Sequence, residues 1–124
     1  MKILHPECKQ EDERGQIIDI LGQEVIEYVT LITSVRGATR GSHYHRATTQ
    51  TVYVLGGRLK LLTQRPDEPV VTAILEKGDL AVTEPMERHT MIALEDAAFM
   101  VFTRGPRGGD DYESDTYRVP PLGE

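Results

Sequence analysis

The histidines His43 and His45 are the side chains of this chain best suited to chemistry. They stand two positions apart among β-branched residues, and in a strand such residues project from the same face. A third histidine, His89, follows a later segment that begins at Gly78. Three imidazoles that converge could hold one divalent first-row metal and leave coordination positions open. We therefore expect Fe, Mn, Ni or Zn at His43, His45 and His89, and no organic cofactor.

Gln50 leaves two kinds of chemistry open at this site. A carboxylate at this position would add charge to a metal centre, whereas the neutral amide oxygen of Gln50 is a weaker fourth ligand. The site could therefore hold a metal through three histidines and Gln50, or hold none. Without a metal, His43 and His45 become candidates for catalytic proton transfer, because histidine titrates near neutral pH.

Several side chains near the histidines could bind a substrate. Arginine pairs well with phosphate oxygens, and four arginines lie around the histidine segment: Arg36, Arg40, Arg46 and Arg58. From this neighbourhood we predict Arg40, Tyr53 and Arg58 as substrate-binding residues. An anionic small molecule is compatible with this set.

The elements that must position these residues are strands. Short apolar and β-branched runs alternate with turn residues, which is typical of an all-β sandwich or barrel. The predicted strands are Gln16–Ile20, Val25–Ser34, Gln50–Gly56, Arg58–Thr63, Val70–Leu75, Leu80–Thr83, His89–Leu94 and Ala97–Thr103. We expect an N-terminal segment over residues 1–13, a barrel over 14–103, and an extended tail over 104–124 that covers the barrel, covers a partner, or is disordered.

Composition excludes several classes of protein. The 124 residues suffice for one domain with one core. The formal net charge is −6 and no basic stripe is present, which argues against nucleic acid as a partner. No run reaches the roughly 20 apolar residues that span a bilayer, and the N-terminus lacks the pattern of a signal peptide. The single cysteine, Cys8, fits a reducing cytoplasm, where we expect the protein to act.

The spacing around the paired histidines resembles the first signature of the cupin superfamily. That signature reads Gly, five residues, His-x-His, four residues, an acidic residue, six residues and Gly, and here it falls on Gly37, His43, His45, Gln50 and Gly57. Only the acidic position departs from the pattern. The resemblance implies a single cupin β-barrel, also described as a double-stranded β-helix or jelly roll.

A second, looser signature supports the same resemblance. Gly78 and His89 have the family's separation, while Pro85 is displaced by one position, Met86 stands where glycine is usual, and Ala93 replaces asparagine. The cupin fold carries many unrelated activities, so this resemblance implies a fold and leaves the reaction open.

A narrower resemblance concerns cupins that act on nucleotide sugars. The segments Asp12-Glu-Arg-Gly15 and Arg40-Gly-Ser-His43-Tyr-His45 resemble elements of dTDP-4-dehydrorhamnose 3,5-epimerases, whose base would correspond to His43. Sugar 3,4-ketoisomerases carry a glutamine at the position of Gln50 and use tandem histidines without metal. Capsular-polysaccharide cupins have a similar histidine segment and bind metal. Resemblance to cupins also implies a homodimer.

These observations predict an enzyme that isomerises or epimerises a nucleotide-linked keto-sugar, or a related small carbonyl compound, by proton transfer through His43 or His45. Two alternatives stay open. One is a metal-dependent cupin enzyme such as a dioxygenase, and the other is a non-enzymatic cupin that binds a metal or a sugar.

Overall fold

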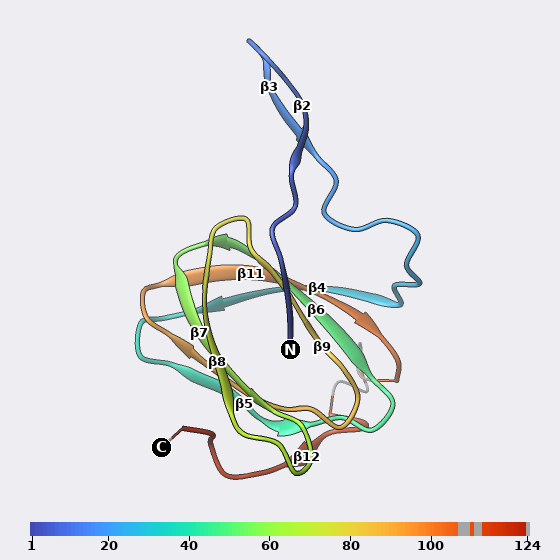
Figure 1. Ribbon diagram of the computed structural model, residues 1–124, viewed down its shortest axis with the longest axis vertical. Coiled ribbons are helices and arrows are strands. Elements are labelled where there is room, and N and C mark those ends of the chain that lie inside the picture. Colours follow the sequence, from blue (N-terminus) through green and yellow to red (C-terminus); the bar gives the residue numbers. More distant parts are fainter. Residues whose placement is uncertain (107–109, 111–112, 124) are drawn as a thin grey trace.

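The computed structural model describes residues 1–106, 110 and 113–123, and its regular elements are β-strands (Figure 1). One five-stranded sheet contains, in spatial order, β1 (Lys2–Leu4), β9 (Leu80–Thr83), β6 (Thr49–Gly56), β11 (Ala97–Arg104) and β4 (Tyr28–Ser34). The other contains β12 (Tyr117–Arg118), β5 (Thr39–Tyr44), β10 (Arg88–Ala93), β7 (Arg58–Gln64) and β8 (Val71–Glu76). A separate hairpin is formed by β2 (Cys8–Asp12) and β3 (Gly15–Ile18). All neighbouring strands are antiparallel.

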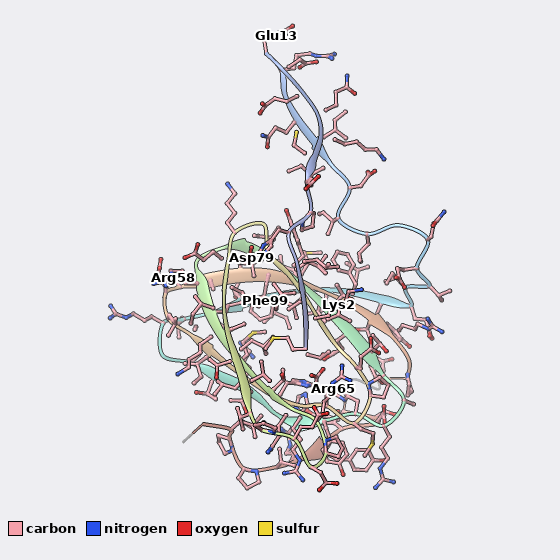
Figure 2. The ribbon with its side chains drawn as sticks, viewed as in Figure 1. Lys2, Glu13, Arg58, Arg65, Asp79 and Phe99 are labelled. Atoms are coloured by element: carbon pink, nitrogen blue, oxygen red, sulfur yellow. The ribbon has the colours of Figure 1, made fainter. Side chains whose placement is uncertain are left out.

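The two larger sheets face each other and enclose the core. Along β11 every second residue is buried, as expected for a strand with one face toward a facing sheet. Phe99 of β11 lies between the sheets in Figure 2 and is 1% exposed. In the part of the chain that is described, the sheets stay separate rather than closing into one hydrogen-bonded barrel. The all-β jelly-roll prediction is confirmed, in the form of a two-sheet sandwich.

All eight predicted strands are present, each with ends within three residues of the predicted ones. The turns between them also form as expected: Gly57, between β6 and β7, has φ +79°, and Gly78, between β8 and β9, has φ +91°. Glycine is required at Gly57, because a Cβ there would lie 2.3 Å from the carbonyl oxygen of Asp96.

Among the residues that the structure describes, four strands were not predicted: β1, β2, β5 and β12. They are short or polar, and β5 contains a glycine, so none shows the apolar alternation on which the sequence prediction relied. β12 lies in the predicted tail and pairs with β5, so the described part of the tail lies along the sandwich. No helix among the described residues is long and apolar enough to cross a membrane.

The hairpin of β2 and β3 projects away from the sandwich (Figure 1). All its strand residues are exposed except Asp12, which is half-buried. At its tip, the Arg14 guanidinium donates to the Asp12 carboxylate at 2.6 Å. Figure 2 labels Glu13 at this tip, at the far end of the molecule from β12. The Asp12–Gly15 segment and the histidine segment together carry the resemblance to epimerases. Within one chain, however, they lie at different ends of the molecule.

Candidate functional site

Three buried histidines meet where β5 and β10 pair. His43 lies opposite His89 in the strand register, and His45 follows directly after the end of β5. The ring centroid of His43 lies 4.7 Å from that of His45 and 4.5 Å from that of His89. One ligand atom from each histidine lies within 4.8 Å of the others. The structure thus brings together the three histidines that the sequence predicted.

A β-bulge in β5 decides which side chains accompany His43. The register slips between His89 and Thr90, and the facing residues Gly41 and Ser42 both have positive φ, at +83° and +58°. Simple alternation would place Arg40 and His43 on opposite faces, because three positions separate them. The extra residue restores a common face, so both residues border the space between the sheets.

Gly41 also permits the close approach of β10. A Cβ at this position would lie 3.0 Å from the carbonyl oxygen of His89. Together with the φ of +83°, this contact explains why a glycine stands beside the histidines.

Backbone carbonyls orient two of the rings. Nδ1 of His45 lies 2.8 Å from the carbonyl oxygen of Asp115, and Nδ1 of His89 lies 3.3 Å from that of Glu87. A carbonyl only accepts, so in both cases Nδ1 carries the proton. When such a ring is neutral, its lone pair is on Nε2, where it can bind a metal or accept a proton.

The histidines adjoin a cavity of about 350 Å³ between the two sheets. Its lining residues are Ile32, Thr39, Arg40, Gly41, His43, Gln50, Val52, Leu61, Thr83, His89, Met91, Phe99, Val101, Glu113 and Arg118. His43 and His89 line it, whereas His45 is not among the lining residues and is 2% exposed. Gln50 contributes from β6 of the other sheet. The cavity has the size and mixed lining of a small-ligand site.

Arg40 is the predicted substrate-binding residue that the structure places at this cavity. Its Nε donates to Ser34 Oγ at 2.7 Å, and an Nη donates to the carbonyl oxygen of Thr33 at 2.9 Å. These bonds hold the exposed Arg40 at the cavity wall, and a guanidinium has further N–H donors that suit an anion.

The other two predicted substrate-binding residues lie elsewhere. Tyr53 is on the opposite face of β6 from Val52 and is not among the lining residues. Arg58 pairs with Glu76 at 3.1 Å, at the edge of the sandwich. Of the remaining arginines, Arg46 lies over the ring of Tyr117, 4.4 Å from its centroid.

Two charged residues of the cavity, Glu113 and Arg118, were missed by the sequence analysis. They belong to the C-terminal segment, which looked like a featureless tail. The available signal was weak: a Tyr-Arg-Val run between two turn-forming stretches, too short to distinguish a strand from a loop.

Asp115 fastens that segment to the histidine strand. Its carboxylate accepts from the backbone N–H groups of Arg46 at 3.0 Å and Ala47 at 2.8 Å, and from Thr48 Oγ1 at 2.9 Å. Burial raises the pKa of Asp115, but these hydrogen bonds and the nearby His45 outweigh it, so the pKa lies below its usual value. The carboxylate of Asp115 thus attaches the C-terminal segment to the loop after β5, and the backbone carbonyl of Asp115 accepts a hydrogen bond from His45.

Glu87 supports the opposite side of the site. Its side chain is 1% exposed and pairs with the α-amino group of Met1, and Arg65 Nε lies 3.7 Å away. Its backbone carbonyl accepts from His89. This buried carboxylate therefore fixes the turn that carries His89.

The donor set fits a first-row metal. Three buried imidazoles, two of them with Nε2 as the unprotonated atom, form the nitrogen-rich set that such ions prefer. The same three rings also suit proton transfer. The geometry is therefore compatible with metal binding and with acid–base catalysis by histidine.

Comparison with solved structures gives the same architecture. QdtA, a sugar 3,4-ketoisomerase from Thermoanaerobacterium thermosaccharolyticum in complex with TDP, superimposes with a TM-score of 0.77, at 23% identity over 96% of this chain and 88% of that chain. A double mutant of QdtA matches at 26% identity, with a TM-score of 0.76, over 94% of this chain and 86% of that chain.

Two further relatives share the fold. The epimerase RmlC from Legionella pneumophila, in complex with dTDP-4-keto-L-rhamnose, has a TM-score of 0.72 at 20% identity, over 86% of this chain and 67% of that chain. CapF, a capsular polysaccharide assembling protein from Staphylococcus aureus, has a TM-score of 0.64 at 17% identity, and the match covers 89% of this chain and 33% of that one.

Sequence comparison assigns the family. No curated protein sequence matches this chain. The family model described as a cupin domain matches residues 30–103, which include the three histidines, Gln50 and the strands that carry them. This chain belongs to the cupin domain family.

Proposed function

We propose that this cupin isomerises or epimerises a nucleotide-linked keto-sugar. The observation that carries the proposal is the pair of buried rings of His43 and His89, which face a cavity that also holds the guanidinium of Arg40. A base beside an anion-binding group suits a substrate with an acidic C–H and a diphosphate. QdtA, a sugar 3,4-ketoisomerase in complex with TDP, and RmlC, an epimerase in complex with dTDP-4-keto-L-rhamnose, support the same substrate class.

The proposed reaction begins with a proton transfer to His43. A ketone acidifies the C–H bond on the neighbouring carbon. The imidazole of His43 takes that proton, and the C–H electron pair forms a C=C bond as the carbonyl oxygen becomes an enolate. His89, whose ring centroid lies 4.5 Å from that of His43, is the second group that can hold or return a proton. A positioned general base typically contributes about 10²- to 10⁴-fold to the rate.

Arg40 has a different role in this proposal. Its exposed position and its bonds to Ser34 and Thr33 suit binding of the diphosphate rather than the reacting carbon. His45 is not among the lining residues and is held by Asp115, so it supports the other two rings.

The test is solvent-proton exchange. The protein is incubated with dTDP-4-keto-6-deoxyglucose in D₂O, and loss of the C3 proton is followed by NMR. We expect exchange and a new sugar product with the wild type, and a loss of about 100-fold or more for His43→Asn. Arg36→Ala, which changes an arginine that does not line the cavity, serves as the control and should retain the wild-type rate. Exchange at full rate in His43→Asn would contradict the role of His43.

A second candidate function is metal-dependent cupin chemistry, such as a dioxygenase. The observation that favours it is the three buried histidines whose ligand atoms lie within 4.8 Å of one another. His43, His45 and His89 would hold the ion, with Gln50 as a weak fourth ligand. A bound metal would supply Lewis-acid or oxygen-activating chemistry.

Elemental analysis separates the two candidates. For a metal centre we expect about one Fe, Mn, Ni or Zn per chain after gentle purification, and less than a tenth of that in a His43→Ala/His45→Ala double variant. For the isomerase, we expect sugar turnover to survive prolonged chelation. Turnover that disappears with the metal and returns when the metal is restored would favour the second candidate.

A further inference from the structure

The C-terminal strand β12 delivers a second arginine to the cavity. Arg118 lies opposite His43 in the register of β12 and β5, so its side chain shares the inward face with that histidine. Its neighbour Tyr117 lies opposite Tyr44 on the other face, where the two rings stack with centroids 5.3 Å apart. The alternation along β12 therefore directs Arg118 to the cavity that it lines.

Arg118 is paired with an acidic residue of the same segment. One Nη of Arg118 donates to both carboxylate oxygens of Glu113, each at 3.0 Å. The two side chains are 66% and 50% exposed. An ion pair this exposed contributes little to stability. A diphosphate offers arginine more oxygens and more charge than a carboxylate does, so it can displace Glu113.

Other contacts hold the segment in place. The N–H of Val119 donates to the carbonyl oxygen of Ser42 at 2.9 Å, and the N–H of Leu122 donates to Thr90 Oγ1 at 3.1 Å. The Leu122 side chain is 8% exposed, and Asp115 binds the loop after β5. Arg118 is therefore positioned by its strand and is not needed to keep that strand attached.

We propose that Arg118 is a second anion-binding residue of this cavity, and that Glu113 competes with the ligand for it. The inference rests on the proposed function for its ligand class, a nucleoside diphosphate. Arg40 reaches the cavity from β5 and Arg118 reaches it from β12, so a diphosphate would be held between two strands that are neighbours in the sheet. In the absence of a ligand, the Glu113 carboxylate pairs with Arg118. A bound diphosphate, which carries more negative charge, replaces Glu113 as the partner of Arg118.

Calorimetric titration with dTDP tests this inference. We expect Arg118→Ala to weaken dTDP binding by about tenfold to hundredfold, the range for a hydrogen bond to a charged group. Glu113→Gln should tighten dTDP binding by about two- to fivefold, because the competing carboxylate is gone. Uncharged thymidine should bind equally to the wild type and both variants. Arg36→Ala is the matched control and should leave the dTDP affinity unchanged.

Because two variants are compared, the test can still be decided if one of them is destabilised. If Arg118→Ala lowers the thermal midpoint, the tightening expected of Glu113→Gln still decides the question. Unchanged dTDP affinity in both variants, or a wild type that does not bind dTDP, would overturn the inference. A wild type that binds dTDP in the expected pattern but leaves keto-sugars unchanged would support the inference and contradict the proposed function instead.

Discussion

Residues with left-handed backbone conformations cluster around the histidines. Gly41, Ser42 and Met86 all have positive φ, and the N–H of Met86 donates to the carbonyl oxygen of His45 at 2.6 Å. For a residue with a side chain this conformation costs about 1–2 kcal/mol. Such strain is often found where a site must be held in one geometry. Here it shapes the bulge beside His43 and the turn beside His45.

Met86 gives a stability prediction. It has φ +70° at the position where the family usually has glycine, and its side chain is 43% exposed. Both Met86→Gly and Met86→Ala remove the side chain, but only glycine adopts this conformation freely. We expect Met86→Gly to be more stable than Met86→Ala by roughly 1 kcal/mol, measured by urea unfolding. An alanine variant as stable as the glycine variant would show that the turn relaxes without cost.

The sequence predicted some residues of the site and missed others for identifiable reasons. His43, His45 and His89 followed from their residue type and spacing. The inward direction of Arg40 depends on the bulge at Gly41 and Ser42, which simple alternation does not include. Tyr53 and Arg58 are near the histidines in the sequence, but neither lines the cavity in the folded chain.

At the scale of elements, the apolar strands were predictable and the polar ones were not. β11 carries strictly alternating buried residues, and β6 and β7 carry runs of buried residues rich in valine and leucine, so all three are recognisable in the sequence. β5 and β12 lack that pattern, since tertiary pairing rather than their own composition makes them strands. These two strands carry His43, Arg40 and Arg118, so the two elements that were hard to predict contribute both arginines of the cavity and one of its two histidines.

The attachment of the C-terminal segment gives a second stability prediction. Asp115→Asn replaces one carboxylate oxygen with an NH2 group, which cannot accept, so one of the two backbone N–H groups of Arg46 and Ala47 loses its acceptor. We expect a loss of about 1–3 kcal/mol in the free energy of unfolding, because the mutation leaves a donor without an acceptor.

A neighbouring substitution controls for this effect. Ser114→Ala, at an exposed position of the same segment, should change stability by less than about 0.5 kcal/mol. Equal stability of Asp115→Asn and Ser114→Ala, measured by urea unfolding, would show that the carboxylate does not anchor the segment.

At the scale of the whole molecule, apolar side chains gather on surfaces that face solvent. Ile17 and Ile18 are exposed on the hairpin, and Val29, Leu31 and Val35 are exposed on and after β4, the edge strand of its sheet. An isolated two-stranded hairpin is marginally stable in water, and an unpaired apolar edge favours association. We propose that a second copy of this chain covers both surfaces, in a two-fold arrangement that uses each surface twice.

This arrangement predicts a homodimer. Light scattering coupled to gel filtration should give about twice the mass of the chain. Leu31→Arg, at a residue 60% exposed on β4, should shift the protein toward a monomer. Ile74→Arg, at an exposed apolar residue of β8 in the other sheet, is the control and should leave the mass unchanged. A wild type that elutes as a monomer across the micromolar range would contradict the proposal.

Because β12 pairs with β5, amide hydrogen exchange in the C-terminal segment depends on whether a ligand occupies the cavity. The amide protons of Val119 and Leu122 are held by acceptors on β5 and β10, so they exchange with solvent only when the segment opens. A ligand that contacts Arg118 binds the closed segment and not the open one, so it raises the free energy of opening in proportion to its affinity. Slower deuterium uptake at these two amides would thus report occupancy of the cavity without any measurement of turnover.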